Sequence, residues 1–128
     1  MRNLLLLLLI LVLLISGCAK EDSTPSYRQI SMEEAMEIME ENTDHLILDV
    51  RTQAEFDSGH IPGAICIPNE TISDAVLQQL PDPDQLILVY CRSGNRSKQA
   101  SQKLAELGYT NVMEFGGINS WPGETVTD

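Results

Sequence analysis

The sequence predicts an α/β domain in which helices cover both faces of a central parallel sheet. Short apolar runs have the length and composition of buried strands, and segments with helical periodicity stand between them. Strands that alternate with helices at short intervals favour a parallel sheet, because each crossover returns the chain to the same end. A short stretch at 27–30 comes first, and the expected strands are 45–50, 64–67, 85–90 and 109–115.

The first helix is expected to begin after Ser31. Glu34 follows three residues later, which is the capping-box arrangement of a helix start. Apolar side chains then recur every three or four residues, so they share one helical face. They are Met32, Ala35, Met36 and Met39. We expect this methionine-rich face to pack in the core.

A brief helix, a turn and a strand are expected next. Thr52 and Glu55 repeat the capping-box pattern, and residues 59–63 have the glycines and proline of a turn. Cys66 lies inside the apolar run 64–67, so we expect a small, buried core residue there.

Two further helices follow in the sequence. Asn69 can cap a helix that extends to Leu80, and the prolines of 81–84 end it. The second helix is expected over 97–107, where Gly108 stops it. The inward side chains of the first are expected to be Ile72, Val76, Leu77 and Leu80.

The carboxyl ends of the strands indicate where a site would lie. Asp49 and Cys91 each end an apolar run. In open parallel sheets, ligands bind beyond the carboxyl ends of the strands. This edge is therefore the predicted active-site edge.

Cys91 stands at the mouth of a small cationic loop, CRSGNRS. Gly94 permits backbone conformations closed to other residues, so successive N–H groups of the loop and of the next helix can converge on one point. Such donors and the guanidinium groups of Arg92 and Arg96 favour a thiolate. A thiolate is the nucleophile that sulfur or phosphoryl transfer requires.

The loop resembles the active-site loop of the rhodanese family of sulfurtransferases. Two other segments resemble its signatures: 48–56 together with 59–64, and 115–118 together with Trp121. The resemblance covers residues 27–123 and implies a rhodanese-like α/β fold.

The resemblance also implies a mechanism. Cys91 would take the outer sulfur of a donor such as thiosulfate as a persulfide, then pass it to a thiol or cyanide-like acceptor, with no metal or organic cofactor. A thioredoxin-like protein is one acceptor of this kind. Asp49 and Arg51 match positions near the site, where they serve in catalysis or as a structural ion pair, and His60 is expected to be structural. The residues that would cradle the sulfur and hold the anionic donor are Arg92, Ser93, Gly94, Asn95 and Arg96.

Two other functions are weighed against sulfur transfer. Phosphatases of the same fold need five residues between the cysteine and the arginine, whereas four separate Cys91 from Arg96 and the next position is Ser97. The spacing therefore favours sulfur over phosphate. A partner-dependent sulfur carrier or binding module with little turnover of its own is the other alternative.

The amino-terminal residues predict an exported lipoprotein. One arginine precedes twelve apolar residues (4–15), too few for a membrane span but suited to a signal peptide. Residues 14–18 (LISGC) resemble a lipobox, so we expect a signal peptide over 1–17, acylation of Cys18 by chains such as palmitate, and a polar tether over 18–26. An ordinary secretory signal is the alternative. The folded domain is expected over 27–128, outside the cytoplasm and held to a membrane by lipid alone.

Charge and cysteine content exclude several partners and sites. The chain has 19 Asp and Glu against 8 Lys and Arg, a net charge of −11. Such a surface repels nucleic acid and anionic headgroups. No metal-ligand spacing joins the histidines to the cysteines. An exported domain could join Cys66 to Cys91, but the apolar context of Cys66 argues against a disulfide.

Overall fold

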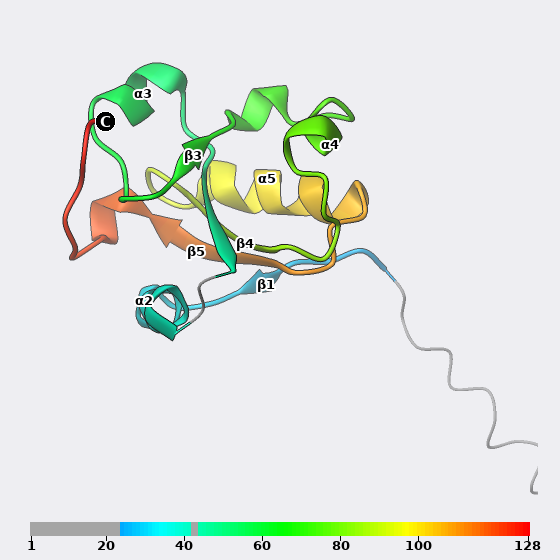
Figure 1. The fold of residues 1–128 in the computed structure, drawn as a ribbon, viewed down its shortest axis with the longest axis horizontal. Helices are drawn as coiled ribbons and strands as arrows, with labels where there is room; N and C mark the ends of the chain where they lie inside the picture. The colour runs from blue at the N-terminus through cyan, green and yellow to red at the C-terminus, as the bar shows by residue number, and fades with distance from the viewer. Residues whose placement is uncertain (1–23, 42–43) are drawn as a thin grey trace, which may run out of the picture.

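The computed structural model describes residues 24–41 and 44–128, which form one sheet with helices on both sides (Figure 1). The predicted signal peptide and Cys18 lie outside the described residues. Five parallel strands pair in the order β1-β5-β4-β2-β3. The strands are β1 (Arg28–Gln29), β2 (His45–Asp49), β3 (Ile65–Cys66), β4 (Leu86–Cys91) and β5 (Val112–Gly117). The helices are α2 (Met32–Glu41), α3 (Gln53–Asp57), α4 (Val76–Gln79) and α5 (Asn95–Glu106), with 3₁₀ turns η1 (Asn69–Thr71) and η2 (Ile118–Ser120). The predicted α/β fold is confirmed.

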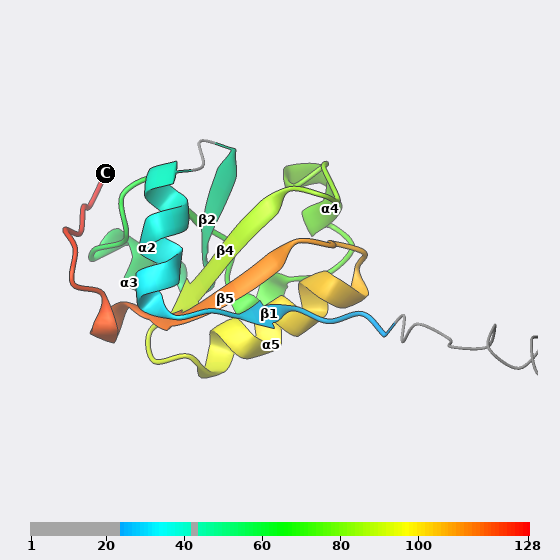
Figure 2. The ribbon, with the colours of Figure 1, turned by 90° about the horizontal axis from the view of Figure 1, so that it is seen from below.

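Two apolar cores lie on opposite faces of the sheet. The helix α2 covers one face, while α5 covers the other (Figure 2). Ala35 of α2 is fully buried against Leu88 and Phe115, and the methionines Met32 and Met39 pack around that cluster, as predicted. On the opposite face, Leu104 of α5 packs with Val89. Among the described residues, no helix is long and apolar enough to cross a membrane.

The strand order brings the predicted site residues to one edge. From β2 the chain adds β3 on one side, and β4 then pairs on the other side of β2. The order of the strands therefore reverses between β2 and β4, where open α/β sheets bind ligands. Asp49 ends β2 in register with Tyr90, one residue before Cys91.

Two sequence expectations about the middle of the chain are wrong. The strand at 64–67 is only the two-residue edge strand β3, where Ile65 is 39% exposed and Cys66 is partly exposed, because β3 has a neighbour on one side only. The single helix at 69–80 is instead η1 and α4, with an extended residue at Ile72 between them.

The composition of 69–80 explains that break. Thr71, Ile72, Ser73 and Asp74 all have poor helix propensity. Leu77, expected to point inward, is 45% exposed, whereas Ile72, Val76 and Leu80 are buried as predicted. Asn69 does not cap a helix; its buried side chain donates to Gln99 and accepts from Lys103 of α5.

The helix after the cysteine loop begins two residues earlier than expected. Gly94 is its N-cap, with φ of 115°, and Asn95 is its first residue. The early start brings the backbone N–H groups of Gly94 and Ser97 to the Cys91 sulfur, where they favour the thiolate.

Candidate active site at the carboxyl edge of the sheet

The thiol of Cys91 is buried within its own loop. Cys91 is the last residue of β4 and is 1% exposed. The Gly94 N–H group donates to Sγ over 3.0 Å, and Oγ of Ser97 lies 3.4 Å from Sγ. The positive φ of Gly94 allows this close curl of the backbone, since other residues rarely adopt that conformation.

Hydrogen bonds shift the ionisation of Cys91 toward the thiolate. Burial by itself opposes ionisation, because it removes the charged form from water. The Ser97 hydroxyl and the backbone N–H groups of Ser97, Gly94 and Ser93 act in the opposite direction, and together they lower the pKa of Cys91 below its usual value. The loop is therefore built to favour a nucleophilic sulfur.

The end of β5 holds the loop from the other side. The N–H group of Asn119 donates to the carbonyl oxygen of Arg92 over 3.2 Å. A Cβ atom at Gly117 would lie 2.1 Å from that same oxygen, so only glycine fits there. Gly117 of the third resemblance segment thus gives the loop backbone room to lie against β5.

The guanidinium of Arg96 is committed to a carboxylate. Its two terminal nitrogens donate to Glu55 over 2.7 and 3.0 Å, and both side chains are 27% exposed. The hydrogen bond from Arg96, with help from Thr52, lowers the pKa of Glu55 to about 2. Glu55 also completes the predicted capping box with Thr52 at the start of α3. Arg96 therefore ties the loop to α3.

Arg92, in contrast, is exposed, and its guanidinium makes no ion pair with any described residue. It lies at a cavity of about 310 Å³ next to the cysteine loop. The cavity is lined by Arg51, Glu55, Ser58, Arg92, Ile118 and Asn119. Of its two arginines, only Arg92 has a side chain available to a small anion.

The buried pair Asp49 and Arg51 supports the same edge. Nη2 of Arg51 donates to Asp49 over 2.7 Å and to the carbonyl of Gly59 over 2.7 Å. Burial opposes the charge on Arg51, but the hydrogen bond and the negative charge of Asp49 outweigh it and raise its pKa. These contacts fix the turn after α3, which fits the structural interpretation of the pair, and Arg51 also lines the cavity.

The second cysteine has the opposite chemistry. Cys66 and Cys91 are both free thiols. Burial and the nearby charge of Asp49 raise the pKa of Cys66 to about 11. His60 is buried, stacks on Phe56 and donates from its Nδ1 to the Phe56 carbonyl over 2.9 Å, which is a packing role.

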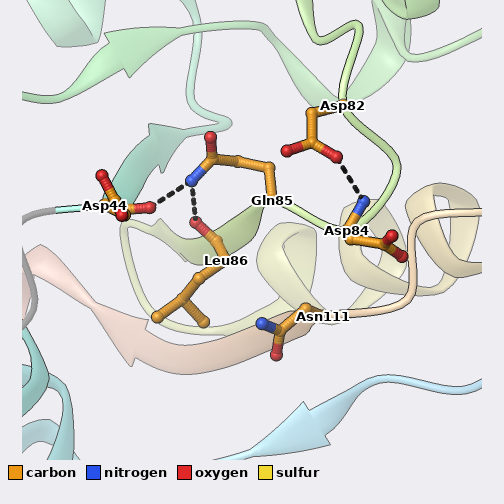
Figure 3. A pocket seen from close by; sticks show the side chains of 6 residues that line it. All are labelled: Asp44, Asp82, Asp84, Gln85, Leu86 and Asn111. Atoms are coloured by element: carbon orange, nitrogen blue, oxygen red, sulfur yellow. Dashed lines mark hydrogen bonds between the residues drawn. The ribbon is translucent and has the colours of Figure 1, made fainter.

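A larger cavity of about 480 Å³ lies at the opposite edge of the sheet (Figure 3). It is lined by Asp44, Asp82, Asp84, Gln85, Leu86 and Asn111. Its polar groups bond to one another: Gln85 donates to the carbonyls of Asp44 and Leu86, and Asp84 N–H donates to Asp82. Within residues 24–41 and 44–128, no group of three or more His, Cys, Asp or Glu could hold a metal ion.

Three site residues were not identified as functional from the sequence. Glu55 was interpreted only as a helix cap, and its partner Arg96 lies 41 residues away in the chain. The sequence predicts Ser97 as the start of a helix and as the position where a phosphatase has arginine, but gives it no role at the sulfur, although it contacts Sγ. Glu114 has no role predicted from the sequence beyond lying inside the expected strand 109–115, yet it is buried and accepts from Ser97.

Comparison with known proteins agrees with this geometry. The rhodanese-like domain family matches residues 31–124. The thiosulfate sulfurtransferase PspE of Escherichia coli is 37% identical over 71 residues, which are 56% of this chain and 68% of that protein. A solved structure described as a rhodanese with anions from E. coli has a TM-score of 0.60 and 32% identity, and the match covers 66% of this chain and 99% of that one.

Longer proteins contain the same domain. The adenylyltransferase and sulfurtransferase UBA4 of Candida albicans is 34% identical over 112 residues, or 82% of this chain, and the match spans only 26% of that protein. The match with the family covers the strands β2 to β5, the cysteine loop, Gly116 and Gly117. Both of these relatives, UBA4 and PspE, carry the name sulfurtransferase. The chain therefore belongs to the rhodanese-like domain family.

Proposed function

We propose that this protein is a sulfurtransferase that carries a sulfane sulfur as a persulfide on Cys91. The observation that carries the proposal is the buried Sγ atom, which receives the Gly94 N–H at 3.0 Å inside a loop that lowers its pKa. The family of the chain and the name of its relative PspE support the same chemistry.

The geometry supports a two-step reaction. The Cys91 thiolate attacks the outer sulfur of thiosulfate, a new S–S bond forms, and the old one breaks with its electron pair leaving on sulfite. A thiophilic acceptor, such as a thiol or cyanide, then removes the outer sulfur and restores the thiolate. The loop N–H groups stabilise the anionic sulfur in both steps.

Arg92 is the donor-binding residue of this proposal. It lines the cavity beside the loop, and its charge is not neutralised by a described carboxylate. A guanidinium binds small oxyanions through paired N–H groups. Arg96 instead braces the loop through Glu55.

Phosphatase activity is disfavoured by the same contacts. A phosphoryl group needs an arginine that faces the nucleophile across a wider loop. Here the only other loop arginine donates both terminal nitrogens to Glu55. The hydroxyl of Ser97, not a guanidinium, lies against Sγ.

The test is thiocyanate formation by the purified full chain from thiosulfate and cyanide. We expect turnover without any partner protein, and a loss of at least about 1,000-fold in Cys91→Ser, because the covalent route disappears. Cys66→Ser is the matched control and should keep its activity within about twofold. A mass gain of one sulfur on the Cys91 peptide would identify the intermediate. Aryl phosphate hydrolysis without thiocyanate would overturn the proposal, and a persulfide that discharges only to an added thiol protein would indicate a carrier.

We also propose that the protein is a lipoprotein acting outside the cytoplasm. The apolar run 4–15 and the LISGC sequence before the domain support this. Labelled palmitate should enter the wild-type protein in cells and fail to enter Cys18→Ser. Equal labelling of the two would overturn the anchor.

A further inference from the structure

A buried carboxylate lies behind the thiol of the candidate site. Glu114 of β5 is 3% exposed, and its Oε1 lies 2.6 Å from Oγ of Ser97. Ser97 is fully buried and lies 3.4 Å from Sγ of Cys91. Thiol, hydroxyl and carboxylate thus form one hydrogen-bonded chain that is almost excluded from solvent. The strand β5 that carries Glu114 runs between β4 and β1 and over α5 (Figure 2).

The position of Glu114 would ordinarily suit an apolar residue. It pairs in register with Val89 in the middle of the sheet and faces the same side as Val112, which is part of the core under α5. An ionised carboxylate that is buried without a counter-charge is strongly unfavourable. Its Oε1 accepts from the Gly116 N–H at 2.9 Å and from Ser97, but Glu114 makes no ion pair with a described residue.

No charged side chain of the elements packed on β5 compensates Glu114. On α5, Arg96 pairs with Glu55, Lys98 is exposed, Lys103 donates to Asn69 and Glu106 accepts from Gln102. On β1, Arg28 is exposed and in register with Met113, which faces the α2 side. The glutamates of α2 are exposed beyond the opposite face: Glu33, Glu34, Glu37, Glu40 and Glu41. The titratable group that the chain of hydrogen bonds connects to Glu114 is Cys91.

The single hydrogen of the Ser97 hydroxyl sets the direction of this chain. Oγ lies within reach of three acceptors, and Glu114 is the nearest of them. When Glu114 is ionised, the hydroxyl donates to it, and the thiol of Cys91 donates to the free side of Oγ. When the thiol hydrogen moves to Oγ of Ser97 and the hydroxyl hydrogen moves to Glu114, the S–H bond and the original O–H bond break. A new O–H bond forms at Ser97 and one at Glu114. The total charge of the three groups stays at −1.

We propose that Glu114 is a positioning residue for the chemistry of Cys91. Glu114 accepts the thiol proton through Ser97, so the thiolate forms without release of a proton to solvent. The inference rests on the proposed function only for the reaction of the thiolate with a sulfur donor. That thiolate then attacks the outer sulfur of the donor. Ser97, which touches Sγ, is the catalytic residue of the pair.

The proposal predicts a particular pH dependence. Two sites that share one proton titrate in two steps, and between them the fraction of thiolate is constant. We would measure the rate at which iodoacetamide alkylates Cys91 in the full chain at a series of pH values, reading the Cys91 peptide by mass spectrometry. The wild-type rate should show a plateau that varies less than about twofold, followed by a second rise. In Glu114→Gln, which keeps the acceptor for Gly116, the rate should rise in one step, at about tenfold per pH unit below a single pKa.

Variants on α5 distinguish the proton relay, which runs from Cys91 through Ser97 to Glu114, from an effect of packing. Ser97→Ala should remove the plateau, and Ser97→Thr, which restores a hydroxyl, should recover it. Ser101→Ala is the matched control, because Ser101 is buried one turn further along α5 and its Oγ has no hydrogen-bond partner among the described residues. It should leave the profile unchanged. If Glu114→Gln fails to fold, the wild-type profile and the Ser97 variants still decide the question.

A wild-type profile with one step, or one that coincides with that of Glu114→Gln, would overturn the relay. Alkylation needs no sulfur donor, so this outcome is independent of thiocyanate formation. A plateau in a protein that forms no thiocyanate would keep the relay and reject the function. Thiocyanate formation with coincident profiles would keep the function and reject the relay.

Discussion

Cys66 and Cys91 both end strands at the same edge of one sheet, yet their ionisation is shifted in opposite directions. Burial opposes the thiolate in both. Cys91 meets the donors of a curled loop and a helix start, whereas Cys66 sits near Asp49 and donates to the carbonyl of Arg51. The end of a strand therefore sets the position of a thiol, and the hydrogen-bond donors of the backbone after it lower the pKa of that thiol.

The residues that follow each cysteine explain the difference. After Cys66 come Ile67 and Pro68, and proline has no N–H group to donate. After Cys91 the chain curls through Gly94 into α5, so its first free N–H groups face the sulfur. Of these two strand ends, the end of β4 is therefore the one that surrounds its thiol with backbone donors.

Among changes that keep both cysteines, the largest expected effect comes from Gly117→Ala, which disturbs the support of the Cys91 loop. Gly117 has an ordinary extended backbone, so the added Cβ strains nothing locally, but it would lie 2.1 Å from the Arg92 carbonyl. The loop must move, and we expect thiocyanate turnover to fall about 100-fold, as for a small misplacement of catalytic groups. Overpacking should also lower the free energy of unfolding by about 1–3 kcal/mol.

Gly108→Ala is the control for that change. Its φ is +106°, and apart from its chain neighbours no atom of the described residues lies within 4 Å of the added Cβ, so it should cost about 1–2 kcal/mol of stability through backbone strain alone. Its turnover should match the wild type at a temperature where both are folded. Full turnover in Gly117→Ala would show that β5 does not position the loop.

Much of this arrangement follows from the sequence, because it depends on local patterns. The apolar runs locate β2, β4 and β5, and the capping boxes locate the starts of α2 and α3. A polar residue at the end of a buried strand is sufficient to place Asp49 and Cys91 at one edge.

The remainder depends on tertiary contacts, which no local pattern encodes. The bond from Arg96 to Glu55 and that from Ser97 to Glu114 join residues 41 and 17 positions apart. The division of 69–80 into η1 and α4 depends on Asn69 binding α5 rather than capping a helix. These contacts decide which arginine remains available and what lies behind the thiol.

The second expected effect is selective alkylation of the two thiols. An ordinary thiol has a pKa of about 8.5, that of Cys91 is lowered, and that of Cys66 is about 11. The thiolate fraction at pH 7 should thus be more than about 100-fold higher for Cys91. The more basic thiolate is about tenfold more nucleophilic, which leaves Cys91 at least about tenfold faster. Peptide mapping after brief treatment with iodoacetamide measures both sites in one sample. Faster labelling of Cys66 would show that exposure, not ionisation, controls reactivity.

The smallest expected effect comes from Glu55→Gln, which removes the charge that binds Arg96 while glutamine can still serve in the capping box. At pH 7 we expect a loss of about 1 kcal/mol or less in the free energy of unfolding, because the pair is partly exposed, and a change in turnover within about threefold. Glu37→Gln, on the exposed side of α2, is the control and should change neither.

The pH dependence of that loss identifies the ion pair as its cause. The pKa of Glu55 is about 2 in the folded protein against an ordinary 4.5, so its contribution is fully present above about pH 4.5 and is lost as the pH falls toward 2. Urea unfolding of the wild type and Glu55→Gln should therefore differ at pH 7 and converge across that range. A difference that stays constant down to pH 2 would mean that Glu55 acts through packing, and that Arg96 needs no charged partner to brace the loop beside Cys91.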